Sequence, residues 1–288
     1  MKFLISGATG YLGFNLVLEL LRNGNRVSII SRRSENSLDR ISMLENEGAI
    51  VLNSEERDFF SKIIKDDIPY DHVIHLAAHY SRSHNPNEVK PILEAALVLG
   101  GQMLEISKIH KSRFYYAGTY LEYMKTELIK STLYVTSKIL YENLVEFYRT
   151  PETFDVTKII FFDTYGRGDT RDKLLNAIFE SKKAGRNLIL KDPNQLLNLT
   201  YISDVVEGIV KITQTPSKRI LRVSSDNFIR VADLLKCVNE LTTPEVMLVK
   251  IDSDLMEQFP ALRFPTPETW LPDTSLSAGI KLMQKTNS

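Results

Sequence analysis

Tyr134 and Lys138 stand four residues apart, and of the twelve tyrosines in the chain only Tyr134 has a lysine at that spacing. They lie in LYVTSKILYENLVEFY, which has a helical pattern, and residues four apart on a helix share one face. An ammonium group nearby lowers the pKa of a phenol, so Tyr134 could exchange a proton near neutral pH. Thr119 follows the predicted strand Arg113–Ala117 and could hydrogen-bond a carbonyl oxygen. We therefore expect Thr119, Tyr134 and Lys138 to be the catalytic residues of proton transfer to a carbonyl.

The N-terminal segment KFLISGATGYLG predicts where a dinucleotide binds. An apolar run at residues 3–5 is typical of a strand buried in a parallel sheet, and a helix is expected over about 11–23. Gly7 permits the tight turn, Gly10 lets the backbone approach a pyrophosphate, and Gly13 lets the helix pack on the strand. The free N–H groups at the start of the helix would face the phosphates.

The end of the second predicted strand indicates which dinucleotide is preferred. NAD-selective sites place a carboxylate there, whereas this strand ends in Ser31, Arg32 and Arg33. Guanidinium groups bind phosphate through paired, charge-assisted hydrogen bonds, so we expect NADP(H), with its 2′-phosphate at these residues.

Other candidate contacts lie at the ends of later strands. We expect further cofactor contacts from Thr9, Tyr11, Leu12, Leu76, Ala77, Ala78, Phe161 and Thr164, and also from Tyr134 and Lys138. Substrate contacts are expected from Thr119 together with His79, Tyr120, Tyr165, Arg167, Arg171 and Lys173, in which the cations would face a diphosphate. His75 and His79 have no carboxylate or cysteine at ligand spacing, so no metal site is expected.

The order of predicted elements indicates an α/β protein with a Rossmann-like, doubly wound parallel sheet. Strands are expected at 27–31, 50–52, 73–76, 114–117 and 158–162, and helices near 35–47, 57–66, 87–110 and 132–149. Helices at 171–184, 203–213 and 231–241 and strands at 187–190 and 219–223 follow. We divide the chain into an NADP-binding domain at 1–165 and a smaller α/β substrate lobe at 166–288, part of which (199–225) returns to the main sheet. Asp204, or its rival Ser203, is expected to cap the helix that follows.

Composition excludes several classes of function. Lys plus Arg and Asp plus Glu both number 36, so no basic face for nucleic acid is implied. The single cysteine, Cys237, excludes an internal disulfide, and no apolar run is long enough to span a membrane. The glycine-rich strand begins at residue 3, which leaves no room for a signal peptide, and we expect a cytoplasmic protein.

The same residues carry a family resemblance. The chain resembles an extended short-chain dehydrogenase/reductase of the NAD-dependent epimerase/dehydratase family in GATGYLG, HLAA, AGTYLEY, YVTSK, FFDTYGRGD and YISDVVEGI. WLPDTSLSAGI resembles the closing motif of the family, so a complete chain is expected. The stretches at 117–123 and 163–175 are most similar to bacterial CDP-paratose and CDP-abequose synthase-type 4-ketoreductases. In that family the Ser/Thr, Tyr and Lys form the catalytic trio, which corresponds to Thr119, Tyr134 and Lys138.

Two departures from the family pattern affect the reaction. Dehydratases of the family follow the threonine with Asp and Glu, but here Tyr120 and Leu121 stand there and Glu122 falls one place later. Dehydratase chemistry is therefore disfavoured. Many members also carry an asparagine for a proton relay where this chain has Ala96.

The resemblance implies NADPH-dependent reduction of the C4 ketone of a nucleotide-linked 4-keto-6-deoxy or 3,6-dideoxy sugar. Such a step belongs to deoxysugar biosynthesis for surface polysaccharide, including lipopolysaccharide. A CDP- or dTDP-linked substrate and a homodimer joined through the helices near 90–108 and 133–148 are expected. The alternatives are an NAD-dependent nucleotide-sugar 4-epimerase and a non-catalytic NADP-binding protein.

Overall fold

The computed structural model describes most of the chain. The described residues are 1–65, 68–81, 85–124, 132–149, 154–186, 188, 192–216, 218–239, 248–251 and 253–284.

The centre of the molecule is a seven-stranded sheet in which every neighbouring pair is parallel. Its strands, in spatial order, are β3 (Ile50–Asn53), β2 (Arg26–Ser31), β1 (Lys2–Ser6), β4 (His72–His75), β5 (Arg113–Thr119), β6 (Val156–Phe161) and β10 (Ile220–Val223). The central strands are buried on both faces, as their continuous apolar runs require. The Rossmann-like α/β prediction is confirmed, and the strand at 219–223 joins the edge beside β6.

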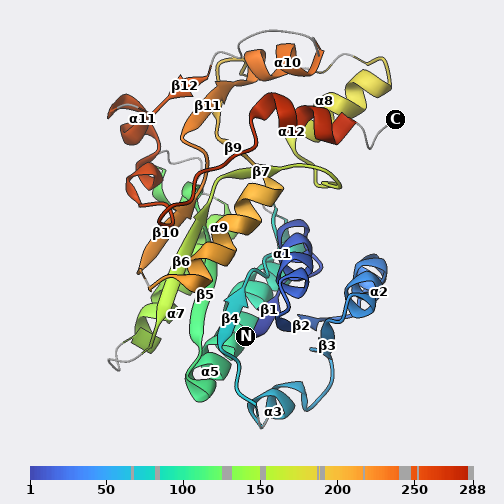
Figure 1. Cartoon of the computed structure of the whole chain (residues 1–288), viewed down its shortest axis with the longest axis vertical. Coiled ribbons are helices and arrows are strands. Elements are labelled where there is room, and N and C mark those ends of the chain that lie inside the picture. Colours follow the sequence, from blue (N-terminus) through green and yellow to red (C-terminus); the bar gives the residue numbers. More distant parts are fainter. Residues whose placement is uncertain are drawn as a thin grey trace.

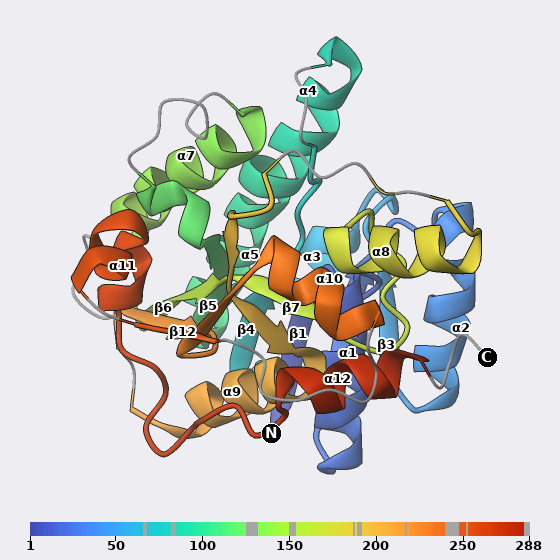
Figure 2. The ribbon, with the colours of Figure 1, turned by 90° about the horizontal axis from the view of Figure 1, so that it is seen from above.

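Helices cover both faces of this sheet. Apolar side chains of α1 (Tyr11–Arg22) and α9 (Ile202–Gln214) share one core with alternate residues of β1 and β2. The other face packs on α3 (Phe59–Ile64), α5 (Leu99–His110) and α7 (Leu133–Arg149). Figure 2 shows α7 and α9 on opposite sides of the strands. The short helix η1 (Glu35–Ser37) and α2 (Leu38–Asn46) connect β2 to β3.

The helix predicted over 87–110 is divided in the structure. It consists of α4 (Pro86–Leu93), a π-helical turn η2 (Glu94–Val98) and α5. Ala96, at the position where many relatives carry the relay asparagine, lies within the π-helical turn and is buried. A π turn inserts an extra residue into a helix, and η2 packs against α7, the helix that carries Tyr134 and Lys138.

The second half of the chain adds small sheets and helices beyond the carboxyl ends of the main strands (Figure 1). β7 (Asp163–Tyr165) pairs in parallel with β9 (Leu199–Tyr201), and β11 (Asn227–Arg230) pairs antiparallel with β8 (Leu196–Leu197) and β12 (Val249–Lys250). The helices here are α8 (Leu174–Lys183), α10 (Val231–Asn239), α11 (Ser253–Gln258), η4 (Pro260–Arg263) and α12 (Leu276–Gln284). The strand predicted at 187–190 lies mostly outside the described residues.

Asp204 attaches the closing segment of the chain to α9. It lies within the first turn of α9, whose N-cap is Tyr201, so neither Asp204 nor Ser203 is the predicted cap. Its carboxylate accepts hydrogen bonds from the backbone N–H (3.0 Å) and the hydroxyl (2.9 Å) of Thr274, and its carbonyl accepts one from Trp270 Nε1 at 2.9 Å. Asp204 and Ser203 both lie inside the helix, which begins at Ile202, so neither occupies the cap position.

Candidate active site

The glycine-rich turn between β1 and α1 has the geometry that a pyrophosphate site needs. Gly7 has φ +77°, and a Cβ there would lie 2.5 Å from the backbone nitrogen of Ala77. A Cβ on Gly13 would lie 2.2 Å from the carbonyl oxygen of Gly7. The structure describes α1 in full. Its first turn contains no acidic residue, and its N-cap residue, Gly10, makes no side-chain hydrogen bond to the helix. These residues fit a dinucleotide, because the turn is compact and the N–H groups at the helix start stay available to phosphate.

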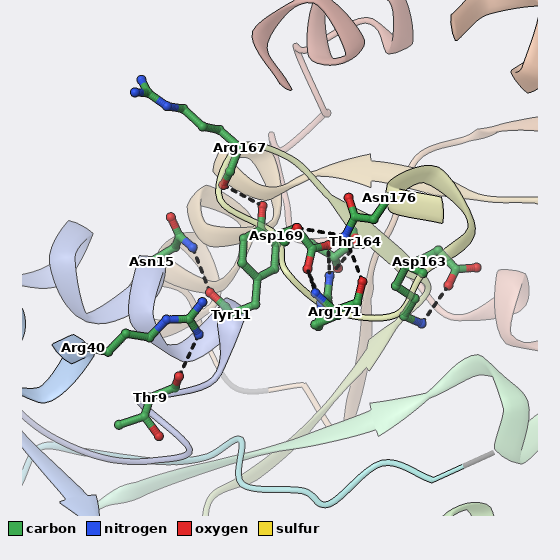
Figure 3. A network of polar contacts seen from close by, with 11 residues as sticks. Thr9, Tyr11, Asn15, Arg40, Asp163, Thr164, Arg167, Asp169, Arg171 and Asn176 are labelled. Atoms are coloured by element: carbon green, nitrogen blue, oxygen red, sulfur yellow. Dashed lines mark hydrogen bonds and ion pairs between the residues drawn. The ribbon is translucent and has the colours of Figure 1, made fainter. Parts of the chain in front are cut away.

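The residues predicted to select NADP differ in how they are held. Ser31 is buried at the end of β2, and its hydroxyl accepts a hydrogen bond from the backbone of Arg33 at 3.2 Å. Arg33 has φ +49° and its guanidinium pairs with Glu45 at 2.7 Å, whereas Arg32 is exposed. Arg40, which the sequence analysis did not single out, reaches from α2 to the carbonyl oxygen of Thr9 at 2.8 Å (Figure 3).

Tyr11 joins the glycine-rich turn to the loop after β7. Its hydroxyl donates to the carbonyl of Arg167 at 3.2 Å, and the guanidinium of Arg171 lies 4.6 Å from its ring centre. Gly166, at φ +151°, passes so close that a Cβ would lie 2.9 Å from the Tyr11 hydroxyl. Figure 3 shows Arg171 beside Tyr11, whereas the side chain of Arg167 points away from both residues.

Arg171 donates hydrogen bonds to protein groups through Nε and Nη2, and its side chain is 37% exposed. It donates to both carboxylate oxygens of Asp169 at 2.7 Å and to the carbonyl of Thr164 at 2.7 Å. The amide of Asn176 closes the loop by donating to the carbonyls of Asp169 and Arg171. Arg171, predicted to bind the substrate diphosphate, therefore serves here to hold the loop against α1.

The Tyr134–Lys138 pair lies on α7 and faces the carboxyl edge of the main sheet. The buried ammonium of Lys138 donates to the carbonyl of Ala117 at 3.0 Å and lies 6.0 Å from the ring centre of Tyr134. Burial lowers the pKa of Lys138 to about 8, an effect that Glu122 opposes and Lys158 reinforces. Burial raises the pKa of Tyr134, and Glu122 and Tyr80 raise it further. The expected lowering of the Tyr134 pKa is therefore wrong for this structure, because the ammonium faces a backbone carbonyl and burial dominates.

Thr119 ends β5 and begins the short helix η3 (Tyr120–Tyr123) in a capping box. Its hydroxyl accepts from the backbone of Leu121 at 3.4 Å, and its backbone N–H donates to Glu122 Oε1 at 2.6 Å. The second oxygen of Glu122 accepts from the ammonium of Lys158 at 2.6 Å. The backbone of Thr119 and the side chain of Lys158 thus fix the position of the Glu122 carboxylate.

Aromatic side chains surround the catalytic pair. The ring of Tyr80, just beyond β4, meets the ring of Tyr134 edge-on at 5.0 Å. Lys173 lies 5.3 Å from the ring centre of Tyr80 and pairs with Asp163 at 3.3 Å. Tyr80 and Asp163 were absent from our predicted contacts, although each lies within a few residues of the end of a main-sheet strand. Tyr120 stacks on Phe162 with ring centres 4.6 Å apart.

The structure places the other predicted residues as follows. Tyr165 is buried against Tyr201 and α12, where a Cβ on Gly279 would lie 2.3 Å from its hydroxyl. His79 pairs with Glu88 of α4. Thr164 is buried in β7, and four residues remain partly exposed near the turn or the strand ends: Leu12, Leu76, Ala77 and Phe161. Ala78 is exposed. Their contacts with a cofactor or substrate stay predictions.

Two negative findings hold for the described part of the chain. None of its helices is both long and apolar enough to cross a membrane. Among the same residues, no group of three His, Cys, Asp or Glu side chains could hold a metal ion.

A parallel sheet that presents a glycine-rich turn and a Tyr-x-x-x-Lys helix at one edge is the arrangement of short-chain dehydrogenases/reductases in their extended form. Comparison of the sequence with known families then identifies the family. Residues 3–223 match the NAD dependent epimerase/dehydratase family, and the chain belongs to it.

Individual relatives are distant. A CDP-abequose synthase of Yersinia pseudotuberculosis is 26% identical over 238 residues, covering 79% of this chain and 75% of its own length. A probable UDP-glucuronate 4-epimerase of Rhizobium meliloti is 25% identical over 247 residues, covering 78% and 72%. Among solved structures, the UDP-glucose 4-epimerase of Thermotoga maritima with UDP-glucose has a TM-score of 0.76 at 19% identity, covering 100% of this chain and 98% of its own. This last likeness establishes the fold alone.

Proposed function

We propose that this protein reduces the C4 ketone of a nucleotide-linked 4-keto-6-deoxy or 3,6-dideoxy sugar with NADPH. The observation that carries the proposal is the placement of Lys138 against the strand that ends at Thr119, with Tyr134 one helical turn away on the same face. A CDP- or dTDP-linked sugar is the substrate class, which the similarity to CDP-abequose synthase supports.

The residues of the site have distinct parts in this reaction. Bound NADPH would supply a hydride to C4. Tyr134 gives the proton to the developing alkoxide, and its raised pKa keeps the phenol protonated until then. Thr119 donates a hydrogen bond to the same oxygen, and Lys138 holds the nicotinamide ribose.

Reduction fits the site better than dehydration does. Dehydratases need a free acid and base beside the threonine, but Tyr120 is stacked on Phe162 and Glu122 is held by Lys158 and the backbone of Thr119. Among the described residues at positions 120–122, no carboxylate is left to remove water from a hexose.

NADPH is proposed over NADH because the described end of β2 carries Ser31, Arg32 and Arg33 and no carboxylate. Arg32 and Arg40 supply the cationic groups for a 2′-phosphate if Arg33 keeps its pairing with Glu45. Arg167, whose side chain points away from the protein contacts of its loop, remains a candidate for the substrate diphosphate.

The second candidate function is an NAD-dependent nucleotide-sugar 4-epimerase. Its support is the similarity to the probable UDP-glucuronate 4-epimerase and the folds of solved epimerases, one of which, from Thermus thermophilus, is described as a complex with NAD (TM-score 0.76, 18% identity). An epimerase restores its own cofactor and gains nothing from NADPH, so the cofactor that is consumed separates the two functions.

The deciding experiment measures nicotinamide oxidation by purified protein, with NADPH and with NADH, against CDP-, dTDP-, GDP- and UDP-linked 4-keto-6-deoxy sugars. NADPH-preferring turnover of one sugar supports the reductase. Absence of oxidation with all of them contradicts it, and NAD released on denaturation would then favour the epimerase.

A further inference from the structure

Lys158 is a charged residue buried in the main sheet, on the strand next to its edge. It lies on β6, between β5 and β10, and its side chain is 1% exposed. Burying an ammonium group is costly unless opposite charges and hydrogen bonds compensate it. The proposed reaction gives Lys158 no part, so its cost calls for another role.

Two carboxylates from different elements compensate this ammonium group. Glu122 of η3 accepts from it at 2.6 Å and Glu142 of α7 at 2.8 Å, with the rings of Tyr123 and Tyr116 5.1 and 5.9 Å away. Gly118 gives the lysine its path, because a Cβ there would lie 2.5 Å from Lys158 Cε. Burial lowers the pKa of Lys158, but Glu122 and the tyrosines outweigh this and raise it, so the group stays charged.

One carboxylate contacts Thr119, and the other lies on the helix that carries Tyr134 and Lys138. Glu122 holds the backbone N–H of Thr119 with its other oxygen. Glu142 follows Lys138 by four residues and Tyr134 by eight, so all three lie on one face of α7. One ammonium therefore fixes the Thr119 segment to the helix face that carries Tyr134 and Lys138.

We propose that Lys158, bridging Glu122 and Glu142, is the positioning residue that holds Thr119 in register with Tyr134 and Lys138. The inference rests on the proposed function for its kinetic consequence, but the bridge itself is independent of the substrate. Among the described residues, the charged and titratable groups around Lys138 are Glu122, Lys158, Tyr134 and His75. The bridge therefore contributes to the electrostatic surroundings of this lysine.

Two single variants and one double variant test the bridge. Lys158→Met removes the ammonium, and Glu122→Gln removes a charge while its amide oxygen can still accept from Thr119. The double variant Lys158→Met/Glu122→Gln leaves no unpaired buried charge beside β6, because the remaining partner, Glu142, reaches solvent. It is therefore less prone to misfolding than either single variant. Arg113→Met is the matched control, because it breaks an ion pair with Asp155 at the opposite end of β5.

We expect the double variant to lower kcat by at least about tenfold, the scale of a small misplacement of catalytic groups, with the KM for NADPH little changed. Arg113→Met should lower the melting temperature and leave kcat as it is. The single variants should shift the alkaline limb of the pH–rate profile in opposite directions: Lys158→Met upward, because a repelling charge near Lys138 is removed, and Glu122→Gln downward. A bridge that only stabilises the fold would leave the kcat of the double variant unchanged, whatever the single variants do to the pH–rate profile.

A kcat of the double variant within threefold of the unmodified enzyme, or limbs that move together, would overturn the proposal. If the unmodified protein turns over none of the sugars, the proposed function fails. The positioning role is then judged by NMR titration of 13Cε-labelled lysine. A displaced 13Cε resonance of Lys138 in the double variant, with the Arg113→Met spectrum unchanged, supports it, and a double variant whose Lys138 resonance and titration match those of the unmodified protein refutes it.

Discussion

Tyr134 and Tyr148 lie on the same helix, α7, so the second tyrosine is a matched control for substitution of the first. If Tyr134 donates the proton, Tyr134→Phe should lower kcat by about 10²–10⁴-fold, the usual contribution of a positioned acid. NADPH affinity, measured by fluorescence titration, should persist. Tyr148→Phe removes only a hydrogen bond to Glu105 at 2.6 Å and should keep its activity. Equal losses in both variants would argue for damage to the helix rather than for loss of a proton donor.

The buried ammonium of Lys138 predicts a pH dependence. Its pKa is lowered from its ordinary value to about 8, so the charged form is present below pH 8 and is lost as the pH rises through that value. The rate of reduction should fall over the same interval. Lys138→Arg carries a guanidinium that stays charged at alkaline pH, so its residual activity should lack this fall. A fall at the same pH in Lys138→Arg would assign the limb to another group.

The sequence predicted which residue types gather at the site better than it predicted their partners. Thr119 and the Tyr134–Lys138 pair follow from spacing and from their place after a strand, and both lie at the expected edge. Lys158, within a predicted strand, gives no sign that two distant carboxylates make its burial possible. Arg171 likewise has the charge expected of a phosphate ligand, and only the fold reveals that Asp169 already engages it.

At the scale of elements, the side chain of Arg171 holds the loop after β7 to α1, whereas Arg167 contributes only its backbone carbonyl (Figure 3). Arg171→Met would break charge-assisted hydrogen bonds worth about 2 kcal/mol of unfolding free energy. For a chain of this size that is a fall in melting temperature of roughly 3 °C. Arg167→Met should change stability by less than about 0.5 kcal/mol, as surface substitutions do, and raise the KM for the nucleotide sugar. Thermal unfolding measures the first effect. Similar destabilisation by both variants would contradict this division of roles.

Elements with a strong local signal were predictable, and short ones were not. The strands of the main sheet are apolar runs buried on both faces, and the amphipathic helices α7 and α9 follow the helical period. β7, β8, β9 and β12 have only two or three residues each and exist because a distant segment pairs with them. The π-helical turn η2 packs on α7, and the sequence pattern predicted a continuous helix there.

At the scale of the whole molecule, an apolar surface on α7 and the adjoining π turn remains exposed. Phe147 is 71% exposed and Leu140 is 44% exposed; they stand seven residues apart and so share a face of α7. Val98 of η2 is 59% exposed, and η2 packs against α7. Exposed apolar side chains on neighbouring elements are typical of protein interfaces. We therefore propose the homodimer expected from the family resemblance, with the helices around η2 and α7 at its interface.

The homodimer makes a prediction that sedimentation velocity can check. Phe147→Glu places a charge where an apolar contact is expected, and the desolvation cost of that charge should convert a dimer into a monomer at micromolar concentration. Met43→Glu is the matched control, because Met43 is 53% exposed on α2, beside the opposite edge of the sheet near β3. That variant should sediment as the unmodified protein does. The active site lies within one chain, so monomeric Phe147→Glu should retain most of its turnover, and any loss would come from weaker support of α7. A monomeric unmodified protein, or a dimer that survives Phe147→Glu, would contradict an interface at this surface.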